Sequence, residues 1–185
     1  MRADAQRNRT AIVRATVELL RRDPDASMAD IAAEAGVGRM TLYGHFATRA
    51  ELLEAALTDA LDRGDVILAQ VDLDGDPREA LTRWIHSGWA LVDQSRSLLA
   101  AAQKELPPAR IRDLHDKAES RVRGLLERGR QSGAFRTDLP VTWLLTTTHV
   151  VMHGAADEIA ATRLTPTEAP HFITATLLSA FTPPA

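Results

Sequence analysis

Residues 28–49 read MADIAAEAGVGRMTLYGHFATR. This stretch contains two short runs with helical spacing, separated by a glycine. Gly36 tolerates the positive φ that a tight turn often requires, and the small Ala32 lets two helices cross closely. Leu42 and Phe46 are then available to face an interior. The pattern predicts a helix-turn-helix.

The second helix of this motif lies in a stretch without negative charge. Between Glu34 and Glu51 the sequence contains no aspartate or glutamate. If Leu42 faces the core, the helical rotation places four residues on the opposite side and two basic residues on its flanks. These are Met40, Thr41, Tyr43 and Gly44, flanked by Arg39 and His45. The stretch therefore offers a surface suited to an anionic partner.

A helix of this kind fits the major groove of DNA, where its N-terminal side chains read base edges. We expect Met40 and Thr41 to meet a thymine methyl group, and Arg39 to reach a guanine or a phosphate. Tyr43, His45 and Arg49 are suited to phosphate oxygens. The alternative is a pair of structural helices that bind no ligand, with Tyr43 half-buried in the core.

The rest of the chain also has helical periodicity, and no segment has the period of two that is typical of a strand. Three Ser/Thr-x-x-acid patterns indicate helix starts, and each resembles a capping box. They are Ser27 with Asp30, Thr48 with Glu51, and Thr165 with Glu168, where Pro166 would take the first helical position. We therefore predict an all-α protein, with an N-terminal three-helix helix-turn-helix head and a C-terminal helical bundle.

The composition excludes several classes of protein. The 185 residues include 22 basic and 25 acidic side chains and no cysteine. Zinc fingers and iron–sulfur sites are therefore excluded, and the net charge of −3 argues against nonspecific coating of nucleic acid. Neither a long apolar stretch nor a signal-peptide pattern is present, so we expect a cytoplasmic protein without a membrane partner.

Several segments together resemble the N-terminal domain of TetR-family transcriptional regulators. They are the Thr-Leu-Tyr-Gly-His-Phe run of 41–46, the Ile-Ala-x-x-Ala-Gly-Val run of 31–37, and the Thr-Arg-x-x-Leu-Leu run of 48–53. The likeness covers residues 8–60 strongly. It extends more weakly to residues 133–139, which look like the link before the two dimerising helices of these regulators.

The resemblance implies a homodimer that binds a palindromic double-stranded DNA operator and is released by a small-molecule effector. By position, Ser27 matches a phosphate-contacting helix cap, Arg39 to Thr41 match the base-reading turn, and Tyr43, His45 and Arg49 match backbone contacts. The sequence departs from the family pattern at Gly38, where Ser or Thr is usual, and at Met40, where a small residue is common.

The predicted division follows from this resemblance. Residues 1–50 form the helix-turn-helix DNA-binding domain, and a helix over 48–71 links it to the remainder. Residues 72–185 form an effector-binding and dimerisation domain. We expect a ligand-responsive repressor rather than an activator, released by a small apolar or amphipathic effector.

The predicted effector pocket is mostly apolar with a few polar anchors. Its candidate residues are Trp84, Trp89, Gln103, His115, Trp143, Thr146, His149 and His153. For the tryptophans, packing in the core is the alternative. His149 and His153 have a spacing that can share a metal, but an obvious third ligand is lacking, so we predict no metal and no cofactor.

The last two predicted helices carry small and apolar residues that suit a surface between two copies of the chain. They are Thr146, Thr147, Val150, Val151, Gly154 and Ala155 on the first, and Ala175, Leu178 and Phe181 on the second. Two other functions stay open. One is a small helical enzyme that uses His149 and His153 with Asp157. The other is a DNA-binding dimer without an effector.

Overall fold

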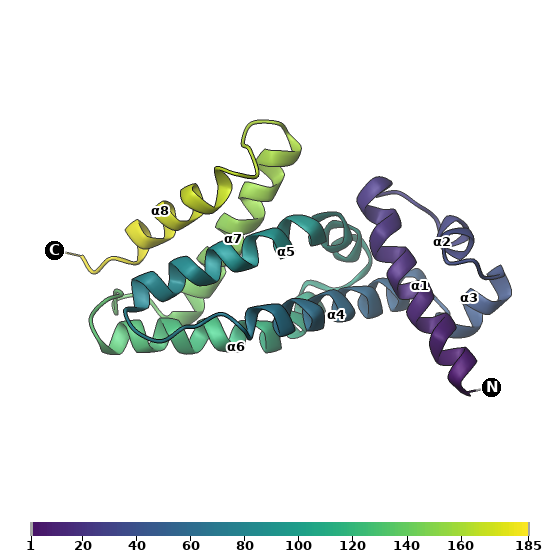
Figure 1. The fold of residues 1–185 in the computed structure, drawn as a ribbon, viewed down its shortest axis with the longest axis horizontal. Helices are drawn as coiled ribbons and strands as arrows, with labels where there is room; N and C mark the ends of the chain where they lie inside the picture. Colours follow the sequence, from purple (N-terminus) through teal and green to yellow (C-terminus); the bar gives the residue numbers. More distant parts are fainter. Residues whose placement is uncertain (1, 185) are drawn as a thin grey trace. The chain divides into compact units, whose positions relative to one another are not determined.

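The computed structural model describes residues 2–184, with their side chains except those of residues 2, 3, 117 and 118. Over this range it contains eight helices and no β-strand, which confirms the all-α prediction (Figure 1). The helices are α1 (Arg2–Arg22), α2 (Met28–Glu34), α3 (Arg39–His45), α4 (Arg49–Leu68), α5 (Pro77–Glu105), α6 (Pro108–Gln131), α7 (Val141–Ala160) and α8 (Ala169–Phe181). Within the described residues, none of these helices combines the length and the apolar composition needed to cross a membrane.

The chain forms two compact units that do not follow one another along the sequence. Unit 1 contains Met1–Arg63 and Gln94–His115, and unit 2 contains Gly64–Asp93 and Asp116–Ala185. Helices α4, α5 and α6 each contribute residues to both units. The sequence-based division at residue 72 differs from this arrangement, because helical periodicity marks where a helix begins and ends and not which part of a long helix packs where.

The core of unit 1 joins the helix-turn-helix to parts of three longer helices. Each helix contributes apolar side chains at most 2% exposed. They include Ile12 and Leu20 from α1, Ile31 from α2, Leu42 from α3, Leu52 and Leu53 from α4, and Leu98 from α5. At the surface, Arg110 of α6 donates hydrogen bonds from Nε and Nη2 to Glu54 Oε1 of α4, at 3.1 and 2.6 Å. The head is therefore held by tertiary packing, as short helices require.

The core of unit 2 is built around α7 and α8 and the segment that precedes them. Gly133 ends α6 with a φ of +77°, as expected for a residue that follows a helix. Phe135 then packs edge-on against Phe181, with ring centroids 6.1 Å apart. Phe181 is only 1% exposed, so its expected place in a surface between two chains is wrong. Its ring is needed inside the chain, where it covers Phe135.

Two of the three capping patterns read from the sequence form reciprocal bonds in the structure, at Ser27 with Asp30 and at Thr165 with Glu168. At the third, the Thr48 hydroxyl accepts from Glu51 N at 3.1 Å, but the Glu51 carboxylate accepts from Ala47 N at 2.8 Å. The Thr165 hydroxyl accepts a hydrogen bond from Glu168 N at 3.3 Å, and the Glu168 carboxylate accepts one from Thr165 N at 3.2 Å. Helix α8 nevertheless begins at Ala169 rather than at Pro166. Ala169 N donates to the carbonyl of Thr165 at 3.2 Å, but Pro170 has no N–H to donate to the carbonyl of Pro166, so the hydrogen-bond ladder is interrupted at this point.

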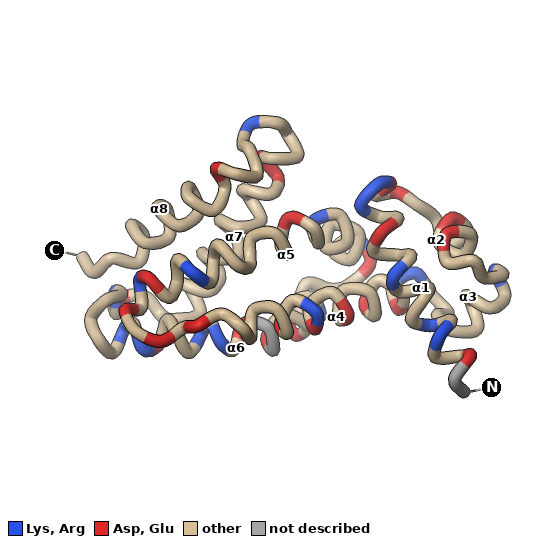
Figure 2. The backbone as a smooth tube through the Cα atoms, viewed as in Figure 1, with Lys and Arg blue, Asp and Glu red and all other residues tan. Residues whose placement is uncertain are grey.

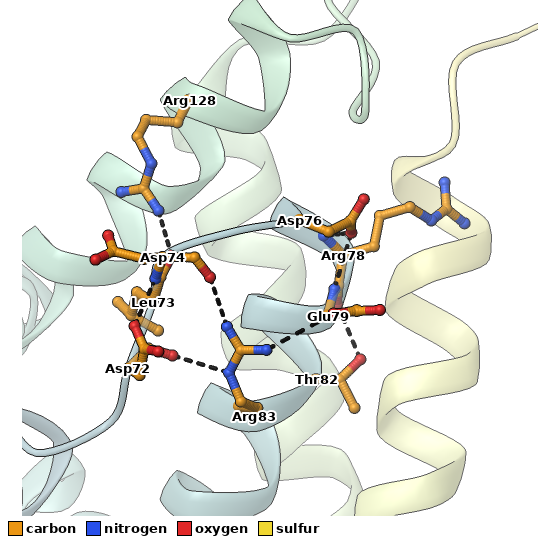
Figure 3. A network of polar contacts seen from close by, with 9 residues as sticks. All are labelled: Asp72, Leu73, Asp74, Asp76, Arg78, Glu79, Thr82, Arg83 and Arg128. Carbon is orange, nitrogen blue, oxygen red and sulfur yellow. Dashed lines mark hydrogen bonds and ion pairs between the residues drawn. The ribbon is translucent and has the colours of Figure 1, made fainter.

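The link between α4 and α5 is held by arginine side chains within unit 2 (Figure 3). Arg83 donates from Nε to the carbonyl of Asp72 at 2.9 Å and from Nη2 to that of Asp74 at 2.7 Å. Arg128 of α6 donates from Nη2 to the carbonyl of Leu73 at 2.5 Å. These guanidinium groups satisfy carbonyls that no helix satisfies, so the link has a defined conformation.

Candidate DNA-binding surface

A capped helix and a glycine turn position the helix-turn-helix. Ser27 caps α2: its hydroxyl accepts a hydrogen bond from Asp30 N, and the Asp30 carboxylate accepts one from Ser27 N at 2.9 Å. At the other end of α2, Gly36 has a φ of +67°. Its N–H donates to the carbonyl of Ala33, and Val37 N donates to that of Ala32 at 3.0 Å. This pair of bonds is a Schellman motif, which closes the helix and redirects the chain into α3.

The orientation of α3 agrees with the sequence prediction. Leu42 is fully buried, and Phe46, which follows the helix, is 2% exposed. Met40 is 85% exposed and Tyr43 49% exposed, so Tyr43 is not a core residue. Arg39, Thr41 and Gly44 are also exposed, and His45 is half-buried on the flank. Burial of Leu42 thus turns the predicted reading face outward.

The charges around α3 are arranged asymmetrically. No acidic residue lies on α3, whereas α2 and α4 both carry them (Figure 2). Hydrogen bonds from the Ser27 side chain and backbone, together with the charge of Arg39, hold the pKa of Asp30 below its usual range. This carboxylate therefore stays ionised, and it holds the cap beside the motif rather than occupying the face of α3.

Acidification is expected to remove the stabilisation that Asp30 contributes. Its pKa is lower in the folded chain than the reference value of 3.8, so the contribution is present above pH 3.8 and is lost as the pH falls through the folded value. The stability difference between wild type and Asp30→Ala should therefore shrink below that pH. Urea denaturation of both proteins over a pH series measures it. A gap that stays constant down to the lowest pH would show that the ionised carboxylate is not responsible.

Two residues assigned to phosphate contacts already have partners within the chain. Arg49 donates from Nη1 to the carbonyl of Ala26 at 2.6 Å, and its Nε lies 3.8 Å from a Glu105 carboxylate oxygen. Its side chain is 24% exposed. The Ser27 hydroxyl donates to Asp30 Oδ2 at 2.6 Å. Both residues thus have a structural role in positioning α2 and the start of α4.

One basic residue near α3 was not singled out by the sequence analysis. The guanidinium group of Arg9 on α1 lies over the ring of Phe46, 5.0 Å from its centroid, in a cation–π arrangement. Arg9 is exposed and lines a surface hollow together with His45. The sequence has arginines at positions 7, 9 and 14. Only the packing of α1 shows that Arg9 lies beside Phe46.

The eight residues predicted for an effector pocket lie in different environments. Trp84 and Trp89 are buried in the core of unit 2, whereas Trp143 and Thr146 are exposed on α7. Gln103 and His115 belong to unit 1. Gln103 is exposed, and a ring nitrogen of His115 lies 2.8 Å from the carbonyl of Ile111. The eight residues therefore do not line one pocket in either unit, because α5 and α6 pass from one unit to the other.

One of the two histidines of α7 contacts an acidic residue of α6, and the second packs against the first. His149 Nδ1 lies 3.3 Å from Glu119 Oε1, and the rings of His149 and His153 are 6.4 Å apart. Among the described residues, no group of three histidine, aspartate or glutamate side chains could hold a metal ion. The structure therefore pairs His149 with Glu119 and places the ring of His153 beside that of His149.

These features together define a helix-turn-helix DNA-binding protein. Residues 12–56 match the family model described as bacterial regulatory proteins, tetR family. The helix-turn-helix of this chain is therefore similar to the DNA-binding segment of that family. The family model describes regulatory proteins, so it gives no support to the enzyme alternative built on His149 and His153.

Individual relatives agree with this assignment. The chain is 35% identical over 78 residues to the HTH-type transcriptional repressor LfrR of Mycolicibacterium smegmatis, a match that covers 42% of this chain and 41% of LfrR. The match thus spans less than half of that relative. The structure of LfrR from Mycobacterium smegmatis in complex with proflavine is 25% identical, with a TM-score of 0.68 over 95% of this chain and 97% of LfrR. A TetR family transcription regulator from Marinobacter aquaeolei VT8 has a TM-score of 0.74 over 98% of both chains, at 20% identity.

Proposed function

We propose that this protein is a ligand-responsive homodimeric transcriptional repressor, which acts in the cytoplasm by binding a palindromic operator through α3. The observation that carries this proposal is the exposed face of α3, which has no acidic residue and is turned outward by the buried Leu42. Met40 and Thr41 contact thymine methyl groups, and Arg39 contacts a guanine or a phosphate. Tyr43, His45, Ser27 and the remaining donors of Arg49 contact the sugar–phosphate backbone.

A second copy of the chain is the partner proposed for α7 and α8. Exposed apolar side chains lie on both helices: Trp143 is 56% exposed, Val150 65% and Phe172 51%. Thr146 and Gly154, also exposed, continue the face of α7. A two-fold axis through this surface would bury it as a four-helix interface. Two recognition helices then reach half-sites about 34–36 Å apart, or a multiple of that distance.

A charge placed on this surface is expected to separate the dimer. In Val150→Asp, a carboxylate replaces a side chain that would be desolvated between the two copies, whereas the fold of the single chain should remain because Val150 is 65% exposed. Analytical ultracentrifugation should then show a monomer with unchanged helical content. Val66→Asp is the matched control, since Val66 of α4 is 68% exposed and lies outside the surface. Dimers that persist in the α7 variant would place the interface elsewhere.

A small apolar or amphipathic molecule is proposed as the effector. LfrR, whose structure is similar to 95% of this chain, has been crystallised with proflavine. A coupling of about 1–3 kcal/mol between effector and DNA is enough to change operator affinity by about 5–150-fold. An operator-bound dimer without effector is the alternative, and in that case no small molecule would alter the affinity for DNA.

The proposed function is tested by selecting bound sequences from random duplex DNA with the purified protein at two salt concentrations. An enriched palindrome is expected. If the dimer neutralises about eight phosphates, the slope of log affinity against log salt should be about −7. A folded dimer that enriches no sequence would overturn the proposal.

Two single variants test the assignment of the reading helix. Arg39→Ala and Tyr43→Phe should each weaken binding to the selected operator, Arg39→Ala by about 1–3 kcal/mol if it contacts a base. If Arg39 contacts only phosphate, the salt slope should instead fall by about one. Arg163→Ala, which makes the same charge change outside the helix-turn-helix, is the control in a fluorescence anisotropy titration. If neither variant weakens binding, α3 is not the reading helix.

A further inference from the structure

The core of unit 2 contains a buried hydrogen-bond donor without an acceptor. Trp84 on α5 is 6% exposed, and its Nε1 is buried with no hydrogen-bond partner among the described residues. An indole N–H can only donate, so no rearrangement of its own proton relieves this. Buried polar groups are nearly always paired, and an exception in a core indicates a missing partner or a function.

A buried acceptor lies on α7. Thr148 is fully buried, and its hydroxyl donates its proton to the carbonyl of Leu144 at 2.9 Å. A hydroxyl group that donates one hydrogen bond can still accept another through the lone pairs of its oxygen. Thr148 Oγ1 is therefore available as an acceptor in the core of unit 2.

Packing between α5 and α7 relates these two polar groups. A Cβ built on Gly88 of α5 would lie 3.9 Å from Cε of Met152 on α7. Trp84 is four residues before Gly88, and Thr148 is four residues before Met152, so each lies one turn earlier on the same face of its helix. The two helices run in the same general direction (Figure 1). Trp84 and Thr148 therefore each lie one helical turn before the contact between Gly88 and Met152.

We infer that unit 2 binds a neutral, apolar molecule that carries a hydroxyl group, such as a phenol or a hydrophobic alcohol. The ligand oxygen accepts the hydrogen bond of Trp84 Nε1, and the ligand proton is donated to Thr148 Oγ1. A charged ligand is disfavoured because Trp84 belongs to a large hydrophobic cluster and no charged residue of unit 2 is buried among the described residues. Met152, an unbranched and flexible side chain beside Gly88, is the residue that moves aside. This inference rests on the proposed effector response and specifies its chemistry.

The test compares naphthol with naphthalene, which differ only in the hydroxyl group, by isothermal titration calorimetry on the full-length protein. Wild type should bind naphthol about tenfold more tightly, as expected for one well-placed buried hydrogen bond. Trp84→Phe keeps an aromatic ring without the donor, and Thr148→Val keeps the shape without the oxygen. Each should abolish the preference, whereas the control Trp89→Phe should retain it. Circular dichroism establishes whether each variant is folded. If one of the two variants does not fold, the other alone still tests the inference.

Two results would overturn the inference. One is a preference for naphthol that survives both Trp84→Phe and Thr148→Val. The other is that neither compound binds to the wild-type protein. The DNA selection experiment tests the proposed repressor separately. If a palindrome is enriched but neither compound binds, the ligand inference is wrong and the proposed repressor stands. Binding of naphthol through Trp84 without an enriched DNA sequence supports the site and removes the proposed repressor.

Discussion

Leu42→Ala is expected to destabilise unit 1 by about 2–5 kcal/mol and to abolish operator binding at moderate temperature. Leu42 is fully buried and is the residue of α3 that holds the helix against the head core. Truncation removes apolar contacts and leaves a cavity, and α3 has no other buried side chain that could fill it. Urea denaturation and DNA titration of the same sample measure both effects.

Met40→Ala is the matched comparison on the same helix. Met40 is 85% exposed, so its truncation should change stability by no more than about 0.5 kcal/mol. Its effect should appear instead in the sequences selected from random DNA, at the positions where a thymine methyl group is contacted. The reverse result, in which Met40→Ala unfolds the head and Leu42→Ala does not, would mean that the two faces of α3 are exchanged.

Gly129→Ala is expected to destabilise unit 2 by about 1–3 kcal/mol, although alanine is the better helix former. A Cβ at position 129 would overlap the ring of Phe135. That ring is 1% exposed and is held in place by Phe181. Phe135 N also donates to the carbonyl of Gly129 at 2.9 Å, so the backbone cannot easily withdraw. Thermal denaturation followed by circular dichroism measures the loss.

Gly124→Ala gives the opposite expectation on the same helix. A Cβ at position 124 meets no atom within 4 Å, so the variant should gain up to about 1 kcal/mol from helix propensity alone. Combining Gly129→Ala with Phe135→Leu should recover part of the lost stability, because the smaller side chain leaves room for the new methyl group. Equal effects at positions 124 and 129 would show that Phe135 does not pack as described.

The helix-turn-helix could be predicted from sequence because its determinants are local. Ser27 and Asp30 are three residues apart, Gly36 ends a short helix, and the burial of Leu42 sets every other side chain of α3 by helical geometry. Such relations extend over a few residues and do not depend on how the rest of the chain folds. Tyr43 is exposed, as predicted, because it is the neighbour of the buried Leu42 on the same short helix.

The effector candidates could not be grouped from sequence in the same way. Trp84 and Gln103 lie on one continuous helix, yet they belong to different compact units. Periodicity shows which residues share a face but not what that face meets along a helix of 29 residues. Phe181 was likewise assigned to a surface between chains, whereas Phe135, distant in sequence, covers it.

The sequence by itself therefore determined the class of fold, the helix-turn-helix and the outward face of α3, because capping, turn chemistry and helical periodicity act between near neighbours. Only the tertiary structure decided that residues 94–115 pack with the head, that Arg9 lies over Phe46, and that Trp84 is buried without an acceptor. These features arise from contacts between segments far apart in the chain. Such contacts depend on how whole helices pack against one another.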